Sequence, residues 1–254
     1  LVIGNLGWGN TNYIFLVACG ASAVLGLYSF FLPNTPPKAD KNVSAAKAFG
    51  AEALGLFKNK AYLIFFIAAV LICIPLSFYY GFTSLFLEEK GMKDPGGQMI
   101  FGQVSEALFI LAIPFLFNSI GVKKMLIIGM LAWILRYVAF AYGDMDSGTW
   151  LLYAGIILHG ICYDFFFVTG YMYTEKKAGE KIKSAAQGLF TFGTYGLGMV
   201  IGTWFSGRIV DHYTAADKSH NWPAIWYVPV YIAVAVLIYF IIFFREKKEI
   251  DTKG

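Results

Sequence analysis

Seven long apolar runs dominate the sequence, and they leave few folds open to it. They cover residues 13–32, 61–86, 99–117, 122–142, 150–174, 185–209 and 223–244. A helix needs about 20 consecutive apolar residues to cross a bilayer, and these runs lack the alternation that membrane strands require. Only 14% of the residues are charged, against about 25% in soluble domains. The sequence therefore predicts an all-α integral membrane protein with about seven transmembrane helices.

One long polar connection separates the first run from the other six. Prolines at 33, 36 and 37 end the first run. Apolar residues at roughly helical spacing in residues 43–57 predict an amphipathic helix on the membrane surface, with a partner-docking helix as the alternative. The turns between most of the last six runs are short, which favours antiparallel neighbours.

This order of one span, a connection and six spans matches the second half of a twelve-helix transporter. Residues 1–32 are then the end of the N-terminal half, comprising the tail of helix 5 and helix 6. Residues 33–60 are the cytoplasmic linker, and residues 61–254 form the C-terminal six-helix bundle, helices 7–12, with its tail. The chain opens in mid-pattern at Leu1. We therefore expect a missing N-terminal half of the same chain as a partner.

The distribution of Lys and Arg predicts the orientation. Fifteen of them fall in the connection, in residues 123–124 and 176–183, and after residue 244, whereas four fall on the opposite side. Cytoplasmic loops of membrane proteins carry the excess of Lys and Arg. The C-terminus and the connection are therefore expected in the cytoplasm. The net charge of +4 follows this topology, so it predicts no nucleic-acid partner.

Two acids lie inside apolar runs, Asp164 in residues 150–174 and Glu106 in residues 99–117. A charge at the bilayer centre costs at least about 2.5–3.5 kcal/mol, so such residues face a protein interior or a water-filled path and are functional by default. Gln103 precedes Glu106 by three residues and projects from the same helix face. The two acids predict a polar cavity within the bundle. The alternative for Asp164 is a capping or pairing role towards a neighbouring helix.

Other polar residues in the runs leave alternatives open. His159 and Tyr163 are four residues apart beside Asp164, and each either lines the cavity or packs in the core. Tyr163 is also suited to stacking on a flat ligand. Arg136 lies about seven residues inside its run. Its expected role is snorkelling to the interface or pairing with a carboxylate on a neighbouring helix.

Small residues in the runs are interpreted as packing features. Gly198 and Gly202 form a small-xxx-small pair that allows close helix contact. Cys19, Cys73 and Cys162 sit in apolar runs without metal-ligand spacing, which predicts packing residues rather than disulfides or ligands. We expect no cofactor and no metal.

Five stretches carry a resemblance to a known family. They are LFKNK (56–60), QVSEALFILAIPF (103–115), AWILRYVAFAYGD (132–144), YDFF (163–166) and SAAQGLF (184–190). In this order and spacing they resemble the bacterial nucleoside permeases, the nucleoside:proton symporters of the major facilitator superfamily. The basic turn at residues 121–124 also resembles a degenerate form of a loop motif of that superfamily.

The resemblance implies a nucleoside held between two six-helix halves, in the bacterial cytoplasmic membrane. It implies that Gln103 and Glu106 hydrogen-bond the nucleoside, that Asp164 is essential for uptake, and that Tyr163 packs on the ligand. It further assigns ligand-contact positions to three residues that differ from a relative: His159 replaces a tyrosine, and Ser77 and Tyr80 replace amide side chains. These differences bear on base selectivity.

The expected function is therefore proton-driven nucleoside uptake by alternating access, in which Asp164 or Glu106 takes up the proton. A symporter for another small polar solute, such as a sugar, is the alternative within the class. A seven-helix receptor fits poorly, because the last run has no Lys for a retinal Schiff base. An intramembrane aspartyl protease would pair Asp164 with Asp144, but Asp144 falls in a short outer turn. We expect a transporter, not an enzyme.

Overall fold

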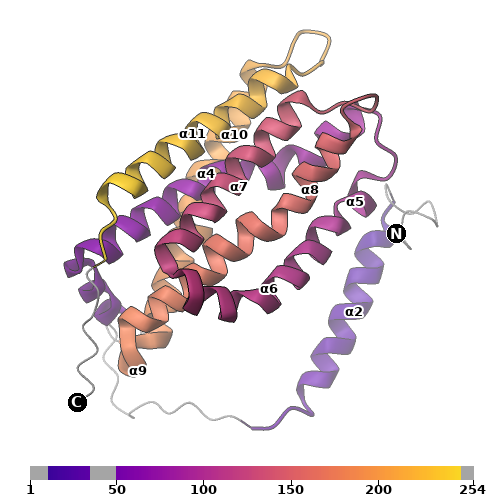
Figure 1. Cartoon of the computed structure of the whole chain (residues 1–254). Coiled ribbons are helices and arrows are strands. Elements are labelled where there is room, and N and C mark those ends of the chain that lie inside the picture. The colour runs from indigo at the N-terminus through magenta and orange to yellow at the C-terminus, as the bar shows by residue number, and fades with distance from the viewer. Residues whose placement is uncertain (1–10, 35–49, 247–254) are drawn as a thin grey trace.

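The structure, a computed structural model, describes residues 11–34 and 50–246, and the regular elements of this part are helices joined by short loops (Figure 1). An isolated bridge between Thr214 and His220 is the one β-type pairing that these ranges contain. The helical elements, in chain order, are α2 (Tyr13–Ser29), η1 (Ala51–Lys58), α4 (Lys60–Glu89), α5 (Pro95–Gln98), α6 (Ile100–Ile120), α7 (Val122–Tyr142), α8 (Thr149–Tyr163), η2 (Asp164–Val168), α9 (Thr169–Thr191), η3 (Phe192–Gly198), α10 (Met199–His212) and α11 (Trp222–Phe243).

The described residues contain five helices that are long and apolar enough to cross a membrane. One of them, Thr149–His212, has 64 residues, or about 96 Å at the helical rise, whereas a bilayer core is about 30 Å thick. The helical backbone is interrupted inside α9 at Gly179, which has φ 66° and ψ 176°. Figure 1 shows α9 at the lower end of the bundle, with α8 and α10 rising from it. The predicted spans 150–174 and 185–209 are thus two helices that meet at Gly179.

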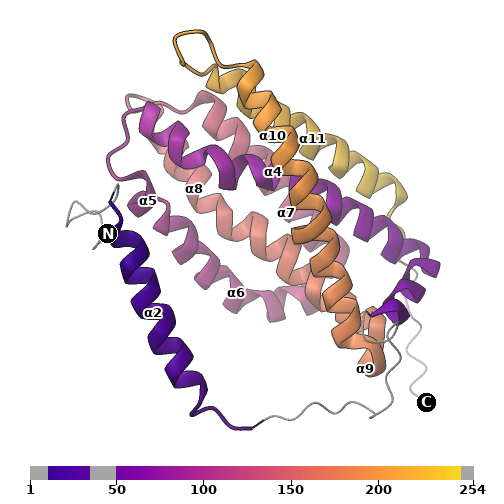
Figure 2. The ribbon, with the colours of Figure 1, turned by 180° about the vertical axis from the view of Figure 1, so that it is seen from behind.

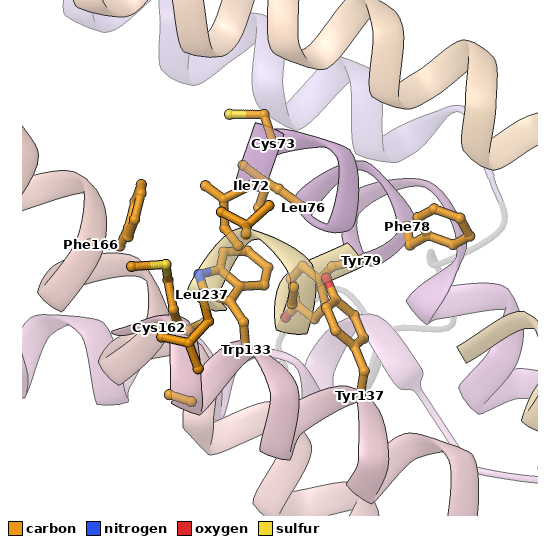
Figure 3. Close-up of a cluster of buried hydrophobic side chains, with 14 of the residues drawn as sticks. Ile72, Cys73, Leu76, Phe78, Tyr79, Trp133, Tyr137, Cys162, Phe166 and Leu237 are labelled. Atoms are coloured by element: carbon orange, nitrogen blue, oxygen red, sulfur yellow. The ribbon is translucent and has the colours of Figure 1, made fainter. Parts of the chain in front are cut away.

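The core of the bundle is aromatic and is built mainly by α4, α7 and α11. The Tyr137 and Trp226 rings are stacked with centroids 5.6 Å apart, and both side chains are fully buried. Figure 3 shows other members of this core, where Leu76 of α4, Trp133 of α7 and Leu237 of α11 point towards one another. This dense packing fixes the position of α7.

Helix α6 lies at the outside of this core. In α6 only Gly102, Ser105 and Ile113 are buried, whereas more than half of the residues of α4 and of α7 are buried. Helix α6 packs chiefly against α8 and η2. Figures 1 and 2 also show α2 apart from the bundle, and none of its residues is buried. With 17 residues, α2 is at the short end of the range for a membrane span.

The predicted amphipathic helix of the connection is only partly covered, because residues 43–49 lie outside the described residues. The following segment, η1, is a 3₁₀-helix rather than an α-helix. It begins after Gly50, whose positive φ of 73° breaks a continuous α-helix. Ala53 is fully buried, and η1 packs against α9. The segment is therefore docked on the bundle, which the prediction of a surface helix did not include.

In the described residues, the basic stretches around Lys123 and Lys177 meet the C-terminal end of α11 at one end of the bundle, as predicted. Lys177 forms an ion pair of 3.1 Å with Glu246. The Lys123 ammonium donates to the Phe244 carbonyl at 3.0 Å. At the other end, Glu89 accepts hydrogen bonds of 2.7 Å from His220 and Trp222, which ties the α10–α11 loop to α4.

The predicted packing of Gly198 and Gly202 is confirmed. A Cβ atom at Gly198 would lie 2.8 Å from the Val70 carbonyl, and one at Gly202 would lie 2.9 Å from the Cys73 carbonyl. Both glycines therefore allow η3 and α10 to approach the α4 backbone. The cysteines are free thiols, as expected, with Cys73 and Cys162 buried and Cys19 exposed on α2.

Candidate functional site

Asp164 occupies the first position of η2, a π-helical turn between α8 and α9. Its side chain is fully buried. Neither carboxylate oxygen has a hydrogen-bond partner among the described residues. The alternative of a capping or pairing role therefore finds no contact in this part of the chain. Turns of this π type occur frequently at functional sites.

Glu106 approaches the same region from α6. Its side chain is 27% exposed, and Gln103, one turn earlier, is exposed. The contact between α6 and α8 is close, because a Cβ atom at Gly160 would lie 2.5 Å from the Glu106 amide nitrogen. Ser105 donates a hydrogen bond of 2.7 Å to the Ile157 carbonyl across this contact. These contacts hold Glu106 beside the helix that leads to Asp164.

His159 lies on α8, one turn before Asp164, and its ring faces Glu106 of α6. Its Nε2 atom lies 3.7 Å from Oε2 of Glu106. Its ring stacks on Tyr79 at 5.0 Å and contacts Tyr163 at 5.5 Å and Tyr80 at 6.4 Å, measured between centroids. His159 is 1% exposed, whereas Tyr80 is half exposed. The structure thus brings Glu106, His159, Tyr163 and Tyr80 into one cluster.

Both expectations for Arg136 are wrong. Its guanidinium is fully buried, so it does not snorkel. It forms a hydrogen bond of 3.0 Å to Nδ1 of His159 and one of 3.4 Å to Cys162, and no carboxylate among the described residues pairs with it. Its central carbon lies 3.2 Å from the centroid of the Tyr79 ring. Arg136 is directed inwards because α8 and α4 supply an acceptor and a ring face there.

Ser77 lies apart from this cluster. It is 3% exposed, donates 2.9 Å to the Cys73 carbonyl of its own helix, and contacts Met199 at 3.5 Å. Its hydroxyl therefore sits at the contact between α4 and α10. Tyr80 and Ser77, which the resemblance grouped as ligand contacts, have different neighbours.

Sequence reasoning missed two tyrosines of the cluster. Tyr79 forms the ring face under Arg136. Tyr195, in the π-helical turn η3, shares a short hydrogen bond with the Tyr163 hydroxyl. A hydroxyl between the glycines of residues 193–198 was the available signal for Tyr195. For Tyr79 the sequence carried no distinguishing signal, because aromatics are abundant.

No group of three or more His, Cys, Asp or Glu that could hold a metal occurs in the part of the chain that the structure describes. The other acid considered for proteolysis, Asp144, caps its own turn, where Oδ1 accepts 2.8 Å bonds from the amides of Asp146 and Gly148. The 15 residues of α8 separate this turn from Asp164, or about 22 Å. The two aspartates therefore do not form a catalytic pair.

A helical membrane bundle with acids inside its apolar helices, one of them buried without a hydrogen-bond partner in the described residues, is the arrangement of a secondary transporter. The chain belongs to the nucleoside H+ symporter family, which it matches over residues 1–249.

Comparisons with individual proteins agree. The chain is 40% identical to YegT of Escherichia coli K12, named as a candidate nucleoside transporter, over 93% of this chain and 57% of that protein. It is 35% identical to the nucleoside permease NupG of the same strain, over 91% of this chain and 58% of that protein. A crystal structure of an aspartate-to-alanine mutant of NupG superposes with a TM-score of 0.83 at 33% identity, covering 96% of this chain and 63% of that chain. The chain thus spans somewhat more than half the length of these relatives.

Proposed function

We propose that this chain forms the C-terminal half of a proton-coupled nucleoside transporter that works by alternating access. The observation that carries the proposal is Asp164, a fully buried carboxylate with no hydrogen-bond partner in the described residues. Membership of the nucleoside H+ symporter family supports both the solute and the coupling ion.

The proton is proposed to bind at Asp164 or Glu106. An ionised carboxylate inside the bilayer costs at least about 2.5–3.5 kcal/mol, so protonation removes an unfavourable charge before the two halves rock. Glu106 is partly exposed, and Asp164 is buried on the helix packed beside it. This difference suits a route in which solvent reaches Glu106 first.

The nucleoside is proposed to bind against α6 and α8. Gln103 and Glu106 offer an amide and a carboxyl group, which suit the hydroxyls of a ribose or the edge of a base. His159, Tyr163 and Tyr80 supply ring faces and polar tips beside them. Ser77 is proposed as a ligand contact only in a conformation in which α10 has moved away from it, because Met199 of α10 contacts its hydroxyl in this structure.

The rest of the cavity wall is proposed to come from an N-terminal half. The exposed side of α6 is largely apolar, yet it carries Gln103, as a surface against a second bundle would. The greater length of the relatives supports this arrangement. We further propose that the protein lies in a bacterial cytoplasmic membrane. The distribution of Lys and Arg supports a C-terminus in the cytoplasm.

The test is uptake of labelled nucleosides, including xanthosine, because a relative at 33% identity is named xanthosine permease. Cells should express the full-length gene product. We expect uptake that a protonophore abolishes. Asp164→Asn should lose accumulation, and Glu106→Gln should raise KM by about tenfold or more, since a hydrogen bond to a charged group contributes about 1.5–3 kcal/mol.

Asp217→Asn is the matched control, because Asp217 is exposed in the α10–α11 loop and bonds only to Ser219 in the described residues. It should transport at the wild-type rate. If Asp164→Asn and Glu106→Gln both keep wild-type uptake and protonophore sensitivity, the assignment is refuted. Uptake of a sugar but of no nucleoside would refute the substrate.

A further inference from the structure

We propose that Arg136 is a positioning residue that fixes His159 in one tautomer, with its Nε2–H group presented as a hydrogen-bond donor to a hydroxyl of the nucleoside. The proposal rests on the proposed transport function for the identity of the ligand. The tautomer itself is independent of that function.

The tautomer follows from which groups can donate. A guanidinium carries only donors. The bond of 3.0 Å between Arg136 and Nδ1 of His159 therefore requires Nδ1 to accept. In a neutral imidazole with Nδ1 as acceptor, the proton sits on Nε2.

The rigidity of this arrangement follows from how Arg136 is held. The central carbon of the guanidinium lies over the Tyr79 ring, 3.2 Å from its centroid, and the guanidinium also donates to Cys162 at 3.4 Å. Tyr79 in turn stacks on the His159 ring at 5.0 Å. Cys162 donates back to the His159 carbonyl at 3.3 Å. The imidazole is therefore held at its face, at Nδ1 and at its backbone.

The arrangement also keeps the ring neutral. A second proton would have to bind at Nδ1, where it would face the guanidinium and break the 3.0 Å bond. The titratable or charged groups around His159 come from five elements. They are Tyr79 and Tyr80 of α4, Glu106 of α6, Arg136 of α7, Cys162 and Tyr163 of α8, and Asp164 of η2. Of these, Glu106 favours a protonated ring, but it lies 3.7 Å from Nε2, farther than Arg136 from Nδ1.

The same distance defines what can bind. A separation of 3.7 Å between Nε2 of His159 and Oε2 of Glu106 is too long for a hydrogen bond. The two atoms form a donor and an acceptor side by side. The His159 side chain is buried and the Glu106 side chain is 27% exposed, so a ligand group would approach the pair from the Glu106 side. A hydroxyl is complementary to both, because it accepts one hydrogen bond and donates another. A ribose hydroxyl is the group of a nucleoside that can accept from His159 and donate to Glu106.

The first experiment reads the tautomer without substrate. The purified full-length protein is labelled with ¹⁵N-histidine, and the ring signal that disappears in His159→Gln is the one from residue 159. We expect the ¹⁵N chemical shifts of this ring to show a proton on Nε2 and a hydrogen-bonded acceptor at Nδ1. These shifts should not change between pH 8 and pH 5. In Arg136→Met it should take up a second proton over this range, and Arg136→Lys should restore part of the wild-type behaviour. A wild-type ring that protonates in this range, or that carries its proton on Nδ1, overturns the proposal.

The second experiment is a double-mutant cycle in nucleoside uptake. Arg136→Met should raise KM by about tenfold, as expected when a donor is no longer aligned, with a much smaller effect on kcat. A glutamine at position 159 donates without any choice of tautomer. Arg136→Met should therefore change KM less than about twofold in the His159→Gln background. A further tenfold loss in the double variant would show that Arg136 is structural and overturn the proposal.

Competition by deoxynucleosides tests the hydroxyl. At least one of the 2′-, 3′- and 5′-deoxy analogues should compete about tenfold less well than the ribonucleoside in the wild type, and Arg136→Met should remove this difference. Equal competition by all three in the wild type overturns the assignment of a hydroxyl. Absence of any nucleoside uptake would instead refute the proposed function, and the ¹⁵N experiment would still decide the tautomer.

Discussion

Replacing Gly160 by alanine should separate the two helices that hold the candidate site. A Cβ atom at this position would lie 2.5 Å from the Glu106 amide nitrogen and 2.5 Å from the Ser105 carbonyl carbon. These are backbone atoms, so no side-chain rotation can relieve the overlap. Ordinary contact begins at 3.4 Å, so α6 has to move by about 0.9 Å.

The energetic result follows from two opposing effects. Overpacking of this kind costs about 1–3 kcal/mol, and the better helix propensity of alanine returns up to about 1 kcal/mol. We expect Gly160→Ala to lose about 1–2 kcal/mol of stability. Transport should fall further than stability alone predicts, because a shift of about 1 Å in a positioned group can reduce a rate by about 100-fold.

The assay compares thermal unfolding in detergent with nucleoside uptake for Gly160→Ala and for Gly207→Ala. The control position is on α10 and has nothing within 4 Å of an added Cβ. Gly207→Ala should therefore be as stable as the wild type or more stable, and it should transport normally. Wild-type uptake by Gly160→Ala would refute the reasoning, because Glu106 would then not depend on the close contact between α6 and α8.

Two further predictions concern hydrogen bonds elsewhere. Tyr137→Phe removes a buried hydrogen bond of 2.5 Å from the Tyr137 hydroxyl to the Pro75 carbonyl, so thermal unfolding should show a loss of stability of about 0.6 kcal/mol. The control Tyr227→Phe removes an exposed hydrogen bond to Tyr142 and should lose no stability. Equal losses in the two variants would contradict the prediction. The amides of Gly148 and Asp146 hold the pKa of Asp144 below its ordinary value near 3.8, so the stabilisation by Asp144 is present above that value and disappears as the pH falls through the lowered pKa. The difference in melting temperature between wild type and Asp144→Ala should accordingly narrow from pH 6 to pH 3, and a constant difference would contradict the linkage.

The transmembrane helices could be predicted because their signal is local. A run of apolar residues must form its backbone hydrogen bonds within the segment when lipid surrounds it, and length then decides the span. The turn between residues 174 and 185 could also be predicted, since charged residues interrupt the apolar pattern there. The 3₁₀ geometry of η1 could not be predicted, because it depends on docking against α9.

The candidate site shows where such reasoning ends. Asp164 and Glu106 could be singled out because each acid interrupts an apolar run. The partner of Arg136 could not be predicted, because His159 lies on the next helix and its acceptor atom becomes available only through packing. The same holds for the hydrogen bond between Tyr163 and Tyr195, which joins the end of α8 to the π-helical turn η3. All the predicted ligand and proton roles stay predictions, those of Ser77, Tyr80, Gln103, Glu106, His159, Tyr163 and Asp164.

The loose attachment of α6 to the core has a consequence for any rocking motion. Among the described residues, α6 makes its largest contact with α8, and this contact is close at Gly160. In the proposed transport cycle α6 and α8 would therefore move together. Glu106 and Asp164 would then keep their spacing while the surroundings change from one aqueous compartment to the other. A solute would meet the same chemical groups on entry and on exit, and the direction of net flux would depend on the proton gradient rather than on a rebuilt binding surface.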